Sequence, residues 1–299
     1  MIGRVADSAT RPDRPGRSDT RESIALRALR ERQPELSEAI DMHLELLEVQ
    51  RRVQARIPLP WFELNADILT RHQAEARPLL QFEDIPIEPT DLRLVVRQTT
   101  DIMRRFGALE DADYRQVQDL GRDVSLLDVI GRWYRAGTEK HAARSARADS
   151  PIGSHRADIS VLDQVLTLAM RPFLSRCAEV LQHRAELAIW SHAHCALCGG
   201  EPDLSVITPT AERHLICGRC ALRWKFAPLT CPYCHNSDRS KITSFATPDG
   251  QYRVYACDVC SRYLKAYDAR RAVRPVMLVV DSVATLPLDA AAIRRGYSG

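Results

Sequence analysis

Eight of the nine cysteines in this 299-residue chain fall into four Cys-x-x-Cys pairs within its C-terminal third. The pairs are Cys195/Cys198, Cys217/Cys220, Cys231/Cys234 and Cys257/Cys260. Two residues between cysteines permit a tight turn whose backbone amides face the sulfurs, so both thiolates can ligate one tetrahedral metal ion. In a reducing compartment this pattern predicts metal ligation and not a disulfide framework.

The spacing between the pairs predicts which of them share a metal ion. There are 18 residues between the first pair and the second, 10 between the second and the third, and 22 between the third and the fourth. Each long interval holds one predicted β-hairpin, which brings its two ends together. We therefore expect two sites in sequence. The first comprises Cys195, Cys198, Cys217 and Cys220, and the second comprises Cys231, Cys234, Cys257 and Cys260.

Both sites are predicted to be structural, because four thiolates fill a tetrahedral metal and leave no position for water or substrate. A segment of this size buries little apolar area, so each metal would supply much of its folding free energy, on a scale of about 10–16 kcal/mol. The expected cofactors are thus two metal ions, one per four-cysteine site. Iron and zinc both fit, and the spacing does not choose between them.

Other potential ligands lie close to the four pairs. The histidines are His192, His194, His214 and His235, but the cysteines already complete both ligand sets. The ninth cysteine, Cys177, lies at helical spacing with Leu166, Phe173 and Leu181. We expect it to be a buried small hydrophobe and not a reactive thiol.

The chain as a whole predicts a multidomain α+β fold. Residues 1–21 are rich in proline and arginine and are expected to form a flexible tail. Residues 22–192 carry apolar side chains every three or four positions, which predicts a multihelical domain. Residues 193–228 and 229–299 are each expected to form a rubredoxin-like or zinc-ribbon-like module with four cysteines, the second with a C-terminal strand and helix.

Individual elements can be predicted within these parts. Residues 92–106 form one helical stripe, with Thr90 as the expected N-cap and Gly107 as the expected stop. Further helices are expected around 110–137 and 157–190. β-strands are expected at 204–208, 213–217, 241–247 and 251–257, the last two joined by a Pro-Asp-Gly turn.

The chain shows no sign of export or membrane insertion. It has no run of about 18 apolar residues, and its first residues lack the apolar centre of a signal peptide. The composition, 45% hydrophobic and 27% charged, is that of an ordinary globular protein. We therefore expect a cytoplasmic protein.

Two functional classes, nucleic-acid binding and thiol–disulfide exchange, fit the pattern poorly. Cysteine ribbons often bind nucleic acid, and residues 195–299 hold 14 Lys and Arg against 9 Asp and Glu, a difference of +5. Two four-cysteine sites with divalent ions would each contribute about −2, which reduces this charge to about +1 and disfavours nucleic acid. A thiol–disulfide oxidoreductase is disfavoured too, because redox pairs usually occur singly at a helix start.

The remaining interpretation is a non-enzymatic factor that binds a protein partner. The chain contains no phosphate-binding glycine loop, zinc-protease motif or nucleophile elbow. A helical body joined to a metal-stabilised module offers a groove in which a partner can dock.

The cysteine motifs resemble one known family. The segment Arg213-His214-Leu215-Ile216-Cys217-Gly218-Arg219-Cys220, followed by Trp224 and by Cys231-Pro232-Tyr233-Cys234, resembles the formate dehydrogenase accessory protein FdhE family. The resemblance continues through Cys257-Asp258-Val259-Cys260-Ser261-Arg262-Tyr263-Leu264-Lys265 and Val280-Asp281-Ser282-Val283. It covers about the last third of the chain.

Membership of that family would imply a maturation chaperone for respiratory formate dehydrogenase. Such a factor would bind the catalytic subunit, with or without its twin-arginine signal peptide, in the cytoplasm before export. The resemblance also implies two rubredoxin-like modules and favours iron as the metal. Because they lie beside the cysteine turns, Trp224, Tyr263, Lys265 and Asp281 are expected near the client-binding surface, with plain packing as the alternative for Trp224 and Tyr263.

Overall fold

A computed structural model of the chain describes residues 20–61, 65–145, 160–182, 185–272 and 274–299. Of the predicted flexible tail, residues 1–21, the first 19 residues lie outside the described ranges. Its last residues belong to the start of α1 (Arg21–Arg32), where the side-chain oxygen of Thr20 accepts a hydrogen bond from the backbone N–H of Ser23. Thr20 is therefore the N-cap of the first helix.

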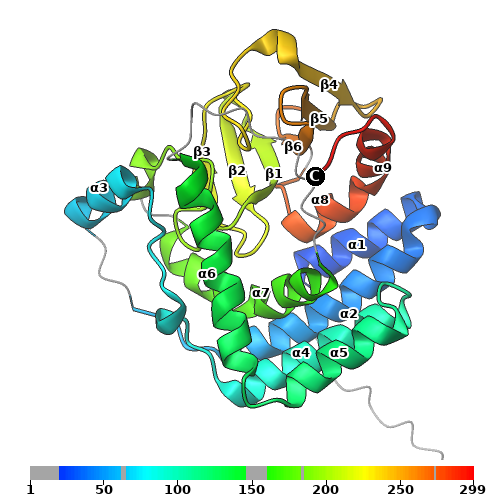
Figure 1. The fold of residues 1–299 in the computed structure, drawn as a ribbon. Coiled ribbons are helices and arrows are strands. Elements are labelled where there is room, and N and C mark those ends of the chain that lie inside the picture. Colours follow the sequence, from blue (N-terminus) through cyan, green and yellow to red (C-terminus); the bar gives the residue numbers. More distant parts are fainter. Residues whose placement is uncertain (1–19, 62–64, 146–159, 183–184, 273) are drawn as a thin grey trace, which may run out of the picture.

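Helices dominate the described residues up to Ile189, as the apolar periodicity predicts (Figure 1). After α1 the α-helices are α2 (Ser37–Gln54), α3 (Ala66–Glu75), α4 (Pro89–Arg105), α5 (Asp111–Arg122), α6 (Leu126–Ser145) and α7 (Val161–Leu181). Three short 3-10 helices connect or follow them: η1 (Pro34–Leu36), η2 (Phe82–Asp84) and η3 (Ala185–Ile189). A further 3-10 turn, η4 (Arg239–Lys241), precedes strand β4.

Helix α4 shows how the sequence sets these bounds. Gly107 adopts a φ of +67°, and its N–H donates to the carbonyl of Arg104, so the helix stops at the predicted glycine. The predicted N-cap, Thr90, was wrong. The N-cap is Glu88, two residues earlier. The helix begins at Pro89, whose fixed φ suits a first turn, and the side chain of Glu88 accepts a hydrogen bond from the N–H of Thr90.

The cysteine-rich part forms one six-stranded sheet. Its strands are β1 (Pro202–Ile207), β2 (Arg213–Cys217), β3 (Arg223–Lys225), β4 (Ile242–Ala246), β5 (Tyr252–Cys257) and β6 (Arg262–Asp268). The order is β3-β2-β1-β6-β5-β4, with β1 and β6 parallel and all other neighbours antiparallel. The predicted fold class, helices followed by two cysteine ribbons, is confirmed, and the ribbons join through the β1–β6 pair.

Two short helices after the sheet cover one of its faces. These are α8 (Leu278–Ala284), which packs against α1 and α2, and α9 (Leu286–Arg294), which packs against β5 (Figure 1). Side chains alternate between the faces of a strand, so Leu204 and Val206 of β1 share a core with Val280 and Val283 of α8. The opposite face carries Leu215 and Leu264, which belong to the core of the helical part.

The first cysteine turn is anchored on the helical part through its backbone. The N–H groups of Leu79 and Leu80 donate to the carbonyls of Ala196 and Leu197, at 2.8 and 2.9 Å. The hydroxyl of Tyr134 on α6 then donates to the carbonyl of Leu80 at 2.9 Å. These bonds fix the position of the first turn relative to the helices. None of the helices described is long and apolar enough to cross a membrane.

Candidate metal centres

The structure brings the eight predicted cysteines together in two groups of four. Cys195, Cys198, Cys217 and Cys220 form the first cluster, and Cys231, Cys234, Cys257 and Cys260 form the second. Within each cluster the four sulfur atoms lie within 4.8 Å of one another. The groups correspond to the sequential pairing expected from the hairpins.

The first cluster is fully enclosed. Cys195 and Cys198 lie in the turn before β1, while Cys217 ends β2 and Cys220 follows in the next turn. The sulfurs of Cys195 and Cys220 are 3.5 Å apart, as are those of Cys198 and Cys217. All four residues are buried, so this cluster is part of the protein core.

The second cluster lies nearer to solvent. Cys231 and Cys260 have sulfurs 3.7 Å apart, and Cys234 and Cys257 have sulfurs 3.6 Å apart. Cys231 and Cys257 are buried, but Cys234 and Cys260 are half-exposed. A chelator or an oxidant therefore has easier access to the second cluster than to the first.

A common turn shapes the pairs. The residue after the second cysteine has a positive φ in every case: Gly199 (+67°), Ala221 (+61°), His235 (+59°) and Ser261 (+54°). In three pairs the N–H of this residue donates to the carbonyl of the first cysteine, at 2.9–3.0 Å. Gly218, which follows Cys217, is not among the positive-φ positions. Three of the four positions carry a side chain, so the sequence offered no glycine signal for them.

The sulfur positions fit a tetrahedral metal ion. Metal–sulfur bonds of about 2.3 Å place the corners of a tetrahedron about 3.8 Å apart, close to the 3.5–3.7 Å separations in the structure. A disulfide would need about 2.05 Å. Nitrogen donors also face the sulfurs: the N–H of Arg219 lies 3.4 Å from the sulfur of Cys217, and the Asn236 amide lies 3.8 Å from that of Cys257. Such donors stabilise thiolate charge.

Burial and mutual hydrogen bonds shift the pKa values of the clustered thiols in opposite directions. Hydrogen bonds from the thiols of Cys231 and Cys260 lower the pKa of Cys234 to about 4. Burial raises the pKa of Cys217, but hydrogen bonds from Cys195 and Cys198 outweigh it and lower that pKa overall. Burial raises the pKa of Cys195 and of Cys220. Each cluster thus stabilises one thiolate through protonated neighbours, whose protons a metal ion would displace.

Arginines flank both clusters. Beside the first, Arg171 donates to the carbonyl of Gly218 at 2.9 Å, and Arg219 stacks on the ring of Trp133 at 4.2 Å. Beside the second, Arg262 pairs with Glu201 at 2.8 Å and stacks on the ring of Tyr233 at 3.6 Å. Cations of this kind offset the negative charge that four thiolates leave around a divalent ion.

The remaining cysteine and the histidines stay outside the clusters. Cys177 lies buried in α7, where burial raises its thiol pKa to about 12, which confirms it as a buried small hydrophobe. His192 and His194 bond through their rings to the carbonyls of Gln73 and Ala76. His214 lies beside Glu212, and His235 is exposed. In the part of the chain that the structure describes, no histidine joins a cysteine cluster.

The four residues expected near a client-binding surface are buried instead. The indole N–H of Trp224 donates to the carbonyl of His192, and both Tyr263 and Lys265 bond to the Asp289 carboxylate. Asp281 is 0% exposed and holds Arg274 in an ion pair. Packing, the alternative for Trp224 and Tyr263, is confirmed, and the two charged side chains have their partners inside the fold.

Comparison with solved structures gives a likeness in fold. No protein-family model matches the chain, and no curated protein matches it. The crystal structure of the FdhE protein from Pseudomonas aeruginosa is similar over 93% of this chain and 91% of that one, with a TM-score of 0.59 and 17% sequence identity. This chain has the FdhE fold. The resemblance noted in the cysteine motifs is thereby confirmed at the level of the fold, and it extends across the helical part as well as the ribbons.

Proposed function

We propose that this protein is a metal-binding accessory factor for the maturation of respiratory formate dehydrogenase. It would bind the catalytic subunit in the cytoplasm before that subunit is exported. The observation that carries the proposal is the FdhE fold over 93% of the chain, together with eight cysteines gathered into two four-sulfur clusters. The motif resemblance supplies the client.

The metal ions would act as cross-links and not as catalysts. Four cysteines complete each tetrahedral set, so a bound ion has no open position at which to activate a substrate. The ions would tie the turn before β1 to the end of β2, and the turn before β4 to the end of β5. The family resemblance favours iron, and the all-sulfur donor set accepts zinc equally well.

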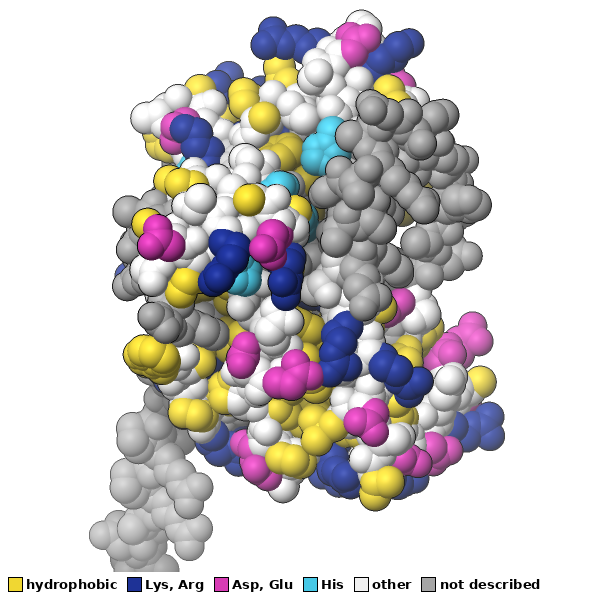
Figure 2. All heavy atoms as spheres, turned by 60° about the vertical axis from the view of Figure 1, so that its left-hand side comes forward, with side chains coloured by type: hydrophobic (Ala, Val, Ile, Leu, Met, Phe, Trp, Pro, Cys, Tyr) yellow, Lys and Arg dark blue, Asp and Glu magenta, His cyan; other side chains and the backbone are white. Residues whose placement is uncertain are grey.

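The surface favours a protein client over nucleic acid. On the face shown in Figure 2, Lys and Arg side chains are interspersed with Asp and Glu. On the first ribbon, Lys225 of β3 pairs with Glu212 at 2.6 Å. A nucleic-acid site needs a coherent basic stripe that neutralises several phosphates. Mixed charge of this kind suits a polar protein contact instead.

An affinity pull-down from anaerobically grown cells tests the proposal. The tagged protein is compared with the double variant Cys231→Ser/Cys234→Ser and with Cys177→Ala, a control that removes a buried thiol outside the clusters. We expect the wild type and the control to recover a formate dehydrogenase catalytic subunit. The double variant should lose it while keeping the metal of the first cluster.

Two outcomes would contradict the proposal. One is recovery of nuclease-sensitive material without the catalytic subunit, which would indicate nucleic-acid binding. The other is equal capture of the subunit by the double variant, which would show that the second cluster is not needed for the interaction.

A further inference from the structure

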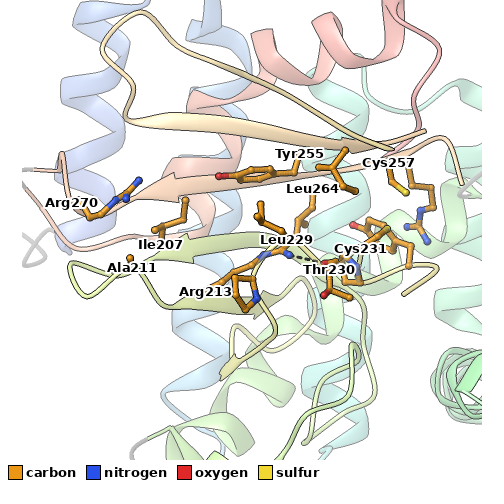
Figure 3. Close-up of a pocket in the computed structure, with 15 residues that line it drawn as sticks. Ile207, Ala211, Arg213, Leu229, Thr230, Cys231, Tyr255, Cys257, Leu264 and Arg270 are labelled. Atoms are coloured by element: carbon orange, nitrogen blue, oxygen red, sulfur yellow. Dashed lines mark hydrogen bonds between the residues drawn. The ribbon is translucent and has the colours of Figure 1, made fainter. Parts of the chain in front are cut away.

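A cavity of about 200 Å³ lies between the sheet and the segment that leads into the second cluster (Figure 3). Its lining includes residues of β1, β2, β4, β5 and β6 and, from the facing segment, residues 228–233. The volume is below the ~300–1,000 Å³ of sites for drug-sized ligands, so it suits a group no larger than one amino-acid side chain.

The wall of the cavity is largely apolar. Ile207, Tyr255 and Leu264 come from three neighbouring strands and point to the same face of the sheet (Figure 3). Leu229 closes the cavity from the opposite segment and has a φ of +58°, a strained conformation for leucine. An apolar body of a ligand would therefore be well accommodated here.

One buried cation in this wall lacks a carboxylate. Arg213 is only 8% exposed; one terminal nitrogen donates to the carbonyl of Thr230 at 2.8 Å, and its Nε has no hydrogen-bond partner. Among the described residues no ion pair to Arg213 is found, whereas the other two lining arginines pair with acidic residues: Arg262 with Glu201 and Arg270 with Asp268. An unpaired buried guanidinium is energetically costly, and a carboxylate is its natural partner.

We propose that this cavity binds a small carboxylate with an apolar body. The carboxylate would pair with Arg213, and an aromatic or branched aliphatic group would lie against Ile207, Tyr255 and Leu264. A free organic acid and the apolar C-terminal residue of a peptide share this chemistry. The site is independent of the proposed function.

The second cluster limits where the negative charge can lie. Cys231 and Cys257 line the end of the cavity opposite Ile207 and Arg270 in Figure 3. Because four thiolates and a divalent ion carry about −2, the carboxylate would approach Arg213 from the side that faces away from the sulfurs. The competing explanation is that Arg213 only balances the charge of the cluster, in which case the cavity would not distinguish a carboxylate from its amide.

A ligand titration followed by saturation-transfer NMR separates these explanations. The probes are 3-phenylpropionate, its amide, acetate, and a blocked tripeptide ending in phenylalanine with either a free or an amidated C-terminus. The full-length wild type is compared with Arg213→Met, with Arg213→Lys, with Ile207→Phe, which fills the cavity, and with Arg223→Met. Arg223 serves as the matched control because it hydrogen-bonds a carbonyl, that of Val276, and does not line the cavity.

The proposal predicts a Kd of about 1 mM or tighter for 3-phenylpropionate or for the free-acid peptide. The amide should bind the wild type about 10- to 100-fold more weakly than the acid does, because a hydrogen bond to a charged group is lost. The acid should bind Arg213→Met more weakly by the same factor, for the same reason. Arg213→Lys should weaken binding less, Ile207→Phe should abolish it, and Arg223→Met should leave it unchanged. If Arg213→Met does not fold, Ile207→Phe and the acid–amide comparison still test the site.

The pattern of binding also identifies the source of the carboxylate. Tighter binding of 3-phenylpropionate than of the free-acid tripeptide indicates that the natural ligand is a small molecule. Tighter binding of the tripeptide indicates the C-terminus of a chain. Equal binding of acid and amide, binding of acetate as tight as that of 3-phenylpropionate, or no saturation by any probe at about 10 mM would overturn the proposal.

Discussion

Replacing Asp281 with alanine distinguishes a structural role from a client contact for this residue. Its carboxylate accepts hydrogen bonds from the hydroxyl of Tyr252 at 2.7 Å, from both terminal nitrogens of Arg274 at 2.6 and 3.2 Å, and from the N–H of Met277 at 2.6 Å. The residue is 0% exposed. The carboxylate therefore connects β5 to the segment that begins α8.

The expected destabilisation follows from the groups that Asp281→Ala leaves unpaired. Removing one partner of a buried ion pair costs about 3–5 kcal/mol. Arg274 retains 23% side-chain exposure and can regain some hydration, which favours the lower end of that range. The buried hydroxyl of Tyr252 would lose its acceptor, a loss of about 1–3 kcal/mol. Because these effects overlap, we expect a total of about 3–5 kcal/mol and a fall in Tm of about 6–15 °C.

Urea unfolding followed by circular dichroism measures this change. Ser282→Ala is the control, because the hydroxyl of the neighbouring Ser282 bonds only to Asp203, an exposed residue, and should cost less than about 1 kcal/mol. The double variant Asp281→Ala/Arg274→Met should recover part of the loss, since no charge is left stranded. A loss below about 1 kcal/mol for Asp281→Ala, combined with failure to capture the client, would refute the structural role.

Three further predictions concern pH, packing and metal removal. Burial, with a smaller contribution from Arg171, lowers the pKa of His43 from 6.5 to about 4. As the pH drops below 6.5, His43 therefore takes up a proton in the unfolded chain before it does so in the folded protein, and the stability of the folded protein falls. Between pH 7 and pH 5, the free energy of unfolding measured in urea should fall by about 2 kcal/mol more for the wild type than for His43→Gln. An equal fall in both proteins would contradict this assignment. A Cβ on Gly200 would lie 2.9 Å from the sulfur of Cys217, so Gly200→Ala should lose the metal of the first cluster by elemental analysis, whereas Gly121→Ala, with 3.8 Å to its nearest side chain, should keep both ions. A chelator should remove the metal of the second cluster first and leave most of the helical circular dichroism signal intact, because only that cluster has half-exposed cysteines. Simultaneous release of both ions with loss of the helical signal would contradict this order.

The cysteine clusters could be predicted from the sequence because each depends on local structure. A hairpin returns its ends to the same place, so the long interval between Cys198 and Cys217 suffices to pair two turns. The helices that precede the cysteine clusters could also be predicted, since their apolar side chains recur every three or four residues. Boundaries were less accurate, as the start of α4 at Pro89 shows.

Features that depend on distant contacts escaped prediction. The parallel pairing of Leu204 with Lys265 joins strands about sixty residues apart, and no local pattern encodes it. The burial of charged side chains was not predicted either, because Arg, Lys and Asp are mostly exposed in proteins. Arg213 and Asp281 lie within the recognised motifs, but only the fold shows that the first lines a cavity and the second holds an internal ion pair.

Metal content and sulfur coordination, measured on the same purified protein, test the central claim most directly. Elemental analysis should find two iron or zinc ions per chain in the wild type and in Cys177→Ala, and one in Cys231→Ser/Cys234→Ser. X-ray absorption should find four sulfur neighbours at about 2.3 Å around each ion. Fewer than two ions in the wild type, or an unchanged metal content in the double variant, would contradict the assignment of two independent four-cysteine sites.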